Sequence, residues 1–170
     1  MRKLIPIFIF IGLVLTAFGE VTPAQEAEFI INIIDNVDWP SGTGGKFIIS
    51  VVGNGKIAQA LTDAAGKKSG GKFNIKINTI TADDDFSEAQ MVVITDNDKA
   101  ALAKVLKQAG GKPILTVTNV AGFARYGVMV ELISPPSSNK IDYAVNRMVA
   151  NKSGLKISDK FISDAIKVFG

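Results

Sequence analysis

Two kinds of apolar pattern alternate along the chain: helical spacings of three and four residues, and short runs that are wholly apolar or apolar at every second position. The first helical spacing follows Thr22–Gln25, which has the form of a capping box with proline at the first helical position. Because proline disfavours helical backbone in the residue before it, Pro40 predicts that this helix ends near Val37. Its apolar face consists of Ala27, Ile30, Ile31, Ile34 and Val37.

Short apolar runs predict β-strands between further helices. Runs such as 46–52 and 91–95 are almost wholly apolar and indicate strands that are buried on both faces. Runs 73–78 and 140–145 alternate with period two and indicate half-exposed strands. The predicted strands are 46–52, 73–78, 91–95, 114–118, 128–133 and 140–145, and the predicted helices are 56–65, 99–108, Asn146 to Gly154, and a last one capped by Ser158 that carries Phe161, Ile162, Ala165, Ile166 and Val168.

The alternation of apolar strands with helices predicts the α/β class. We expect one domain, a three-layer α/β/α sandwich around a mixed, mainly parallel sheet. The strands on either side of Pro135-Pro136 predict a hairpin, and hence an antiparallel edge of that sheet.

The N-terminus has the pattern of an export signal. A basic pair at 2–3 precedes the mostly apolar residues 4–15, and small residues lie where signal peptidase would cut after Gly19. About a dozen apolar residues are too few to span a hydrocarbon core of about 30 Å. We therefore expect a cleaved signal peptide at 1–19 and a single domain at 20–170 that acts outside the cytoplasm.

The chain contains no cysteine and no histidine. The first absence excludes a disulfide framework and thiol chemistry, and the second removes the usual general base and the commonest metal ligand. Outside the cytoplasm, nucleotide cofactors are not routinely supplied either. The composition thus predicts a protein that is not an enzyme and that holds no cofactor or metal ion.

Basic and acidic residues are interspersed along the chain. The formal net charge of +3 falls to about +1 once Arg2 and Lys3 leave with the signal. This pattern favours a solvated surface over a basic stripe for nucleic acid.

The segment between the fourth and fifth predicted strands, Asn119–Gly127, carries an aromatic and arginine motif between two glycines. Asn119, Phe123, Arg125 and Tyr126 are candidate partner-binding residues, because aromatic and arginine side chains are enriched at protein interfaces. The alternative is that Phe123 or Tyr126 packs against the edge of the core.

Trp39 and Pro40 form the second candidate contact site. Trp39 is the sole tryptophan and stands where the first helix is predicted to end. A tryptophan there either packs as a lid on the core or serves as an aromatic anchor at an interface.

Three other motifs have both a purely structural and a functional interpretation. Gly53–Lys56 joins a strand to a helix, which is either a plain turn or a site for a small anionic ligand. Asp83–Asp85 lacks calcium-loop spacing and is interpreted as a solvated turn near Phe86-Ser87. Asp142 and Glu131 could pair across neighbouring strands as in a carboxylate hydrolase, but no other catalytic residue type accompanies them.

Several of these segments, taken in order, resemble the YfiR-like periplasmic family. No single segment is decisive, but the ordered set covers nearly all of the chain after the signal. The segments are Phe29–Pro40, Phe47–Gly53, Ile114–Phe123, Gly127–Ile133, Ile141–Asn146 and Gly154–Ile162.

The resemblance implies a small periplasmic α/β domain that forms a homodimer and acts as a regulator. Better-known members repress an inner-membrane diguanylate cyclase by binding its periplasmic part, and an OmpA-like outer-membrane lipoprotein releases them. Such a protein would control cyclic-di-GMP signalling and biofilm behaviour. The alternative function is a periplasmic receptor for an anionic metabolite or nucleotide. The redox switch of cysteine-containing members is excluded here, because this chain has no cysteine.

Overall fold

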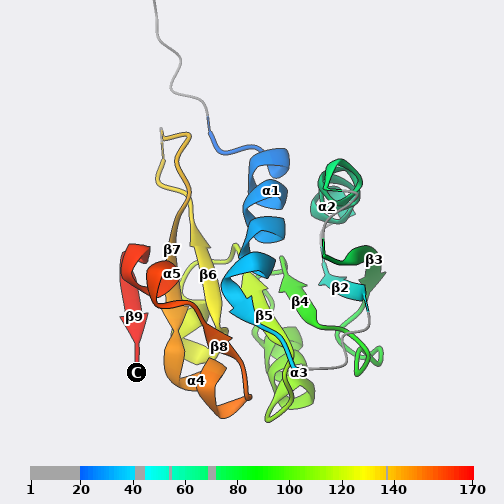
Figure 1. Cartoon of the computed structure of the whole chain (residues 1–170), viewed down its shortest axis with the longest axis vertical. Helices are drawn as coiled ribbons and strands as arrows, with labels where there is room; N and C mark the ends of the chain where they lie inside the picture. The colour runs from blue at the N-terminus through cyan, green and yellow to red at the C-terminus, as the bar shows by residue number, and fades with distance from the viewer. Residues whose placement is uncertain (1–19, 41–44, 54, 69–71, 137) are drawn as a thin grey trace, which may run out of the picture.

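A seven-stranded mixed sheet forms the centre of the computed structural model, which describes residues 20–40, 45–53, 55–68, 72–136 and 138–170 (Figure 1). The predicted signal peptide and its cleavage site lie outside the described residues. Neighbouring strands from β3 to β6 run parallel, β7 is antiparallel to β6, and β9 is parallel to β7. In spatial order the strands are β3 (Asn74–Ile80), β2 (Lys46–Val52), β4 (Met91–Ile94), β5 (Leu115–Thr118), β6 (Val130–Ile133), β7 (Asp142–Asn146) and β9 (Lys167–Phe169).

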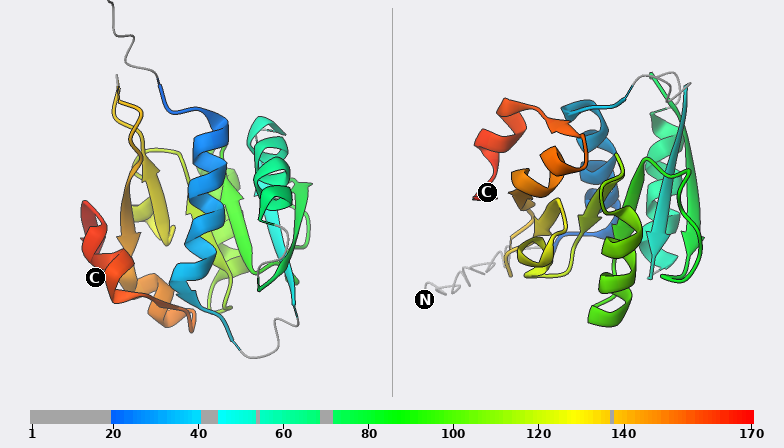
Figure 2. Two further views of the ribbon diagram at one scale, coloured as in Figure 1. Left: turned by 45° about the horizontal axis from the view of Figure 1, so that its top comes forward. Right: turned by 90° about the horizontal axis from the view of Figure 1, so that it is seen from below.

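Helices cover both faces of the sheet, which confirms the three-layer α/β/α sandwich (Figure 2). The larger core lies under α1 (Pro23–Ile33) and α2 (Gly55–Lys67) and extends to α4 (Arg147–Lys152) and α5 (Asp159–Asp164). A second core lies on the opposite face under α3 (Lys99–Ala109). Successive residues of β2 and β4 point into alternate cores, so the runs that the sequence marks as wholly apolar are buried on both sides.

The first helix begins as the sequence predicts. The Gln25 amide donates to Thr22 Oγ1 at 3.3 Å, and the Thr22 amide donates to Gln25 Oε1 at 2.8 Å, which closes the capping box. Pro23 occupies the first turn, where its missing N–H leaves no hydrogen bond unmade.

The helical backbone ends next to Val37, as predicted, although its last turn is not α-helical. The α-helix stops at Ile33, a 3₁₀ turn η1 (Ile34–Asn36) follows, and β1 (Val37–Asp38) pairs antiparallel with β8 (Lys156–Ile157). Pairing with a strand more than a hundred residues away therefore ends the helix before Pro40 does. A local periodicity cannot anticipate such a partner.

The predicted last helix is too long. It ends at Asp164, Ala165 is extended, and the Ile166 amide donates to the Tyr143 carbonyl at 3.0 Å. The chain then adds β9 outside β7, so the hairpin of β6 and β7 is confirmed but its second strand does not form the sheet edge. The backbone of β7 thus accepts a hydrogen bond from the Ile166 amide and pairs with β9, in place of a further helical turn.

Candidate interaction surface

The loop between β5 and β6 is held in one shape by two glycines and a short 3₁₀ helix, η2 (Phe123–Tyr126). Gly122 precedes η2 with φ of 87°, and Gly127 follows it with φ of 115°. Both values lie in the left-handed region that side chains with a Cβ rarely adopt. The glycines therefore set where the loop enters and leaves η2.

Glu131 fastens this loop to the sheet. Its carboxylate accepts hydrogen bonds from the amides of Gly122 and Ala124, both at 2.7 Å, although the residue is only 6% exposed. Asn146 adds a third bond, from Nδ2 to the Ala124 carbonyl at 2.9 Å. Since hydrogen bonds to a buried charged group are strong, these contacts pre-organise the loop before any partner binds.

The loop exposes two of the four candidate residues. The Arg125 side chain is exposed, and Tyr126 is 56% exposed with Lys99 Nζ 5.8 Å from its ring centroid. The expectation that Phe123 makes partner contacts is wrong, because its ring is 2% exposed and packs in the core under α3. The alternative interpretation, in which an aromatic residue of this loop packs into the core, holds for Phe123.

The Asn119 side chain contacts Glu26 near the start of α1. Its Nδ2 donates to Glu26 Oε2 at 3.0 Å. Partial burial raises the pKa of the Glu26 carboxyl above its ordinary value, and the hydrogen bond from Asn119 partly opposes that rise. Asn119 thus links the loop to α1, and its partner-binding role remains a prediction.

Trp39 lies at the other end of α1. Its ring is half-buried and stands edge-to-face on Phe47 with centroids 4.8 Å apart, and its Nε1 donates to the Ile34 carbonyl at 2.9 Å. These contacts match the lid interpretation, whereas Pro40 is exposed beside residues that are not described. The structure therefore does not bring the two candidate contact sites together.

The Gly53–Lys56 turn lies at the carboxyl edge of β2, where the chain crosses between neighbouring strands and many α/β proteins bind ligands. Protein atoms fill the space beside Gly53: a Cβ there would lie 2.5 Å from Asp96 Oδ1 and 2.6 Å from Thr95 Oγ1. A carboxylate at this place repels an anion. The geometry thus disfavours the anionic-ligand site at this turn, although Asn54 itself lies outside the described residues.

A groove that the sequence does not reveal lies between α1, β7 and α5. It has a volume of about 580 Å³. Tyr143 stacks on Phe161 at 4.3 Å and contacts Phe29 at 5.3 Å, and these rings form an aromatic floor. Tyr143 also donates its hydroxyl to the Phe161 carbonyl at 2.7 Å, and burial, with a smaller contribution from Asp164, raises its pKa to about 12.

Two ion pairs border this groove. Lys140 Nζ lies 2.6 Å from Asp142 Oδ1, and Lys160 Nζ lies 2.8 Å from Asp164 Oδ2. Only the i,i+4 pair of Lys160 and Asp164 could have been read from the sequence. The aromatic contacts depend on α1 meeting β7 and α5 in space.

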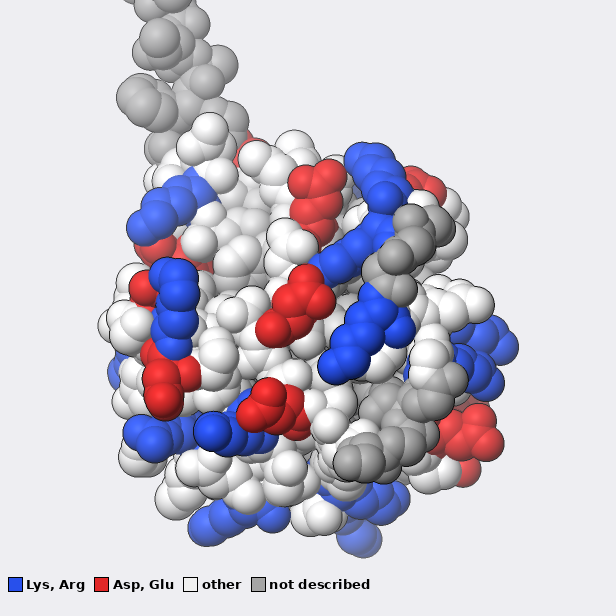
Figure 3. All heavy atoms as spheres, in the orientation of Figure 1, with Lys and Arg blue, Asp and Glu red and all other residues white. Residues whose placement is uncertain are grey.

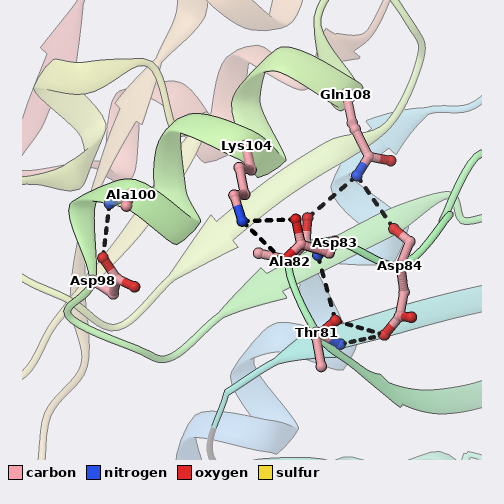
Figure 4. Close-up of polar contacts among 8 residues, drawn as sticks. All are labelled: Thr81, Ala82, Asp83, Asp84, Asp98, Ala100, Lys104 and Gln108. Atoms are coloured by element: carbon pink, nitrogen blue, oxygen red, sulfur yellow. Dashed lines mark hydrogen bonds and ion pairs between the residues drawn. The ribbon is translucent and has the colours of Figure 1, made fainter.

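The triple aspartate forms a structural turn, as expected. Asp84 accepts from the Thr81 amide and hydroxyl at 2.7 and 2.8 Å, and Lys104 Nζ lies 2.7 Å from Asp83 Oδ1, so the turn is bound to α3 (Figure 4). Asp85 in turn accepts from the Ser87 amide at 2.9 Å. Hydrogen bonds to their carboxylates lower the pKa of both Asp84 and Asp85.

The two carboxylates considered for hydrolysis have separate structural partners. Glu131 pairs in register with Ala144, whereas Asp142 pairs with Ile133. Glu131 holds the η2 loop, and Asp142 forms an ion pair with Lys140. The geometry disfavours a carboxylate hydrolase.

No helix among residues 20–40, 45–53, 55–68, 72–136 and 138–170 is long and apolar enough to cross a membrane.

Solved structures share this fold at low sequence identity. One is a conserved domain protein from Vibrio cholerae O1 biovar eltor, with a TM-score of 0.56 and 14% identity over 87% of this chain. Another is the ABC domain in complex with L-Trp from Streptococcus pneumonia, with a TM-score of 0.56 and 10% identity over 86% of this chain. This chain covers 60% of each of those two chains, and at such identities the likeness concerns the fold alone. No curated protein sequence matches this chain.

A family assignment comes from the sequence. The YfiR/HmsC-like family model matches residues 23–165, which include every helix of the described fold and all of its strands except β9. The chain belongs to the YfiR/HmsC-like family. The resemblance inferred from the ordered sequence segments is thereby confirmed.

Proposed function

We propose that this protein is a periplasmic regulator that represses a membrane-bound diguanylate cyclase by binding the periplasmic part of that enzyme. Membership of the YfiR/HmsC-like family supports the class of function. The observation that carries the proposal in this chain is the pre-organised η2 loop, which exposes Arg125 and Tyr126 on a fixed backbone. Arginine and tyrosine dominate the binding energy of many protein interfaces.

Binding through a fixed loop explains how such a protein would regulate its partner without catalysing a reaction. Because Glu131 and Asn146 already hold the loop, a partner does not have to order it, and more of the contact energy remains as affinity. The bound cyclase would shift toward its inactive arrangement by no more than the difference in affinity between its two states.

Two further partners complete the proposal. An OmpA-like outer-membrane lipoprotein would release the cyclase by binding the regulator in competition with it. A homodimer would present two loops to a dimeric cyclase, so that both contacts act together. The absence of cysteine means that protein contacts, and not disulfide exchange, switch this regulator.

The test is co-expression with a membrane-bound diguanylate cyclase of the same organism, followed by measurement of cellular cyclic-di-GMP and of binding to the purified periplasmic domain. Wild-type protein should lower cyclic-di-GMP, and Arg125→Ala with Tyr126→Ala should weaken binding by roughly tenfold or more. Lys76→Ala, on exposed β3, is the matched control and should behave as wild type. A wild-type protein that neither binds the domain nor lowers cyclic-di-GMP would disprove the proposal.

A receptor for a small molecule is the second candidate, and the groove between α1, β7 and α5 is the observation that favours it. The groove has an aromatic floor and carries both lysine and aspartate side chains at its border. Such a site suits a compact ligand that has an apolar body, a positively charged group and a negatively charged group. A thermal-shift screen with amino acids, L-tryptophan among them, and with nucleotides tests it. A ligand at about 100 times its dissociation constant stabilises by about 2.7 kcal/mol. No shift with any compound would exclude the groove as a receptor site for these two classes.

A further inference from the structure

A second, smaller pocket lies directly beside the η2 loop, between α3 and α4. Its volume is about 170 Å³, which suits a single side chain better than a whole metabolite. Its walls come from the C-terminal half of α3, from η2, from β5 and from α4. The lining residues are mostly apolar or small: Leu106, Ala109, Gly110, Thr116, Tyr126, Gly127, Met129, Val149 and Ser153.

This pocket has rigid walls. Met129 is 2% exposed, and its amide donates to Thr116 Oγ1 at 3.0 Å. Gly127 has φ of 115°, and a Cβ there would lie 3.6 Å from Leu106 Cδ1. Tyr126 is the exposed aromatic residue of the lining, so the pocket is one half of a preformed hot spot and the tyrosine ring is the other.

Three exposed basic residues are chain neighbours of residues that line the pocket. Lys107 follows Leu106 in the chain, Arg125 precedes Tyr126 and Lys152 precedes Ser153, so each of the three adjoins a lining residue. We call these three residues the basic rim. Among the residues that the structure describes, none of the three lies within 4.0 Å of a carboxylate.

The rim belongs to a strongly basic part of the chain. Residues 99–158 contain nine lysine and arginine residues but only two acidic ones, Glu131 and Asp142. Glu131 is buried against η2, and Asp142 is paired with Lys140. Several basic side chains elsewhere are paired: over α1 and α2, Lys67 pairs with Glu28 and Lys68 with Asp35, and basic and acidic side chains adjoin there (Figure 3). On α3 itself, Lys104 pairs with Asp83.

We propose that the surface formed by α3, η2 and α4 docks an acidic segment of a partner protein, which inserts one apolar side chain into the pocket beside Tyr126. The positive rim is complementary to an acidic segment and steers its approach. A second copy of this chain does not fit, because the same positive charge would face itself. This inference rests on the proposed function in that it describes the partner chemistry of the η2 surface.

The test uses the protein purified from the periplasm after expression of the full chain, and a fluorescent peptide in which Phe-Leu is flanked by runs of Asp and Glu. Fluorescence polarisation should detect binding that weakens as salt is raised. Lys107→Glu with Arg125→Glu should reduce the affinity by roughly tenfold or more. Lys46→Glu with Lys76→Glu changes the net charge equally on the β2 and β3 side and should reduce it by less than about twofold.

Control probes separate this proposal from general attraction to anions. A peptide with Gly-Ser in place of Phe-Leu should bind more weakly, and Val149→Phe, which fills the pocket, should weaken the original peptide with little change in melting temperature. The proposal is overturned if the acidic peptide does not bind, or if Lys-flanked peptide binds equally well. Tighter binding to phosphatidylglycerol vesicles than to the peptide would overturn it in favour of a membrane surface.

These outcomes are independent of the cyclase experiment. If the cyclase domain binds wild type and the Lys107→Glu, Arg125→Glu variant equally well, the proposed surface is wrong while the regulator function stands. If the acidic peptide binds at the rim but the cyclase domain does not bind at all, the surface stands and the proposed cyclase partner is wrong.

Discussion

At the scale of single residues, Glu131 has the most consequences for the proposed function. It is a charged residue inside the sheet, and its two oxygens accept the Gly122 and Ala124 amides. A buried carboxylate is tolerated only when its hydrogen bonds are made, so the loop and the glutamate depend on each other. From the sequence, Glu131 entered only a disfavoured carboxylate-hydrolase alternative, whereas in the structure it positions the loop that exposes Arg125 and Tyr126.

Glu131→Gln tests this dependence. The amide group can accept only one of the two N–H bonds and places a donor against the other, so unfolding should become easier by about 1–3 kcal/mol. Urea denaturation measures the change, and hydrogen exchange should show faster exchange at the Gly122 and Ala124 amides. The exposed Glu88→Gln is the matched control, with little expected change. Unaltered exchange at both amides would contradict the role assigned to Glu131.

At the scale of elements, local sequence signals specify where helices begin better than where they end. Thr22, Asp98, Asn146 and Ser158 each accept a backbone N–H at the start of a helix, and the caps at Thr22, Asn146 and Ser158 are as predicted. The ends of α1 and α5 depend instead on pairing of β1 with β8 and of β9 with β7. A cap acts within four residues, but a strand pair joins distant segments.

Thr22→Ala should lower the stability by about 1 kcal/mol, because the capping box loses the Thr22 oxygen that accepts from the Gln25 amide. Thr62→Ala is the matched control, since Thr62 lies within α2, where its hydroxyl donates to the Ala58 carbonyl at 2.9 Å. That change should be neutral within a few tenths of a kcal/mol. Equal destabilisation by the two substitutions in urea would show that the box adds nothing particular to α1.

At the scale of the whole molecule, paired and unpaired basic side chains among the described residues lie on different parts of the surface. Over α1 and α2, lysines are neutralised by carboxylates of the neighbouring helix, whereas the α3, η2 and α4 surface has a basic rim beside an apolar pocket. The prediction of evenly interspersed charges overlooked residues 99–158, which hold nine basic and two acidic residues, and it did not reveal which of the described basic side chains are unpaired.

The sequence by itself determined the α/β class, the strands β2 to β7, the starts of α1, α4 and α5, and the family, because apolar periodicity and capping chemistry act over a few residues. Only the tertiary structure decided that Phe123 is buried while Tyr126 is exposed, that Glu131 holds η2, that β9 joins the sheet, and that a pocket lies beside the basic rim. These features arise where segments far apart in the chain meet. The energy of such contacts depends on geometry in three dimensions, which no local pattern of residues records.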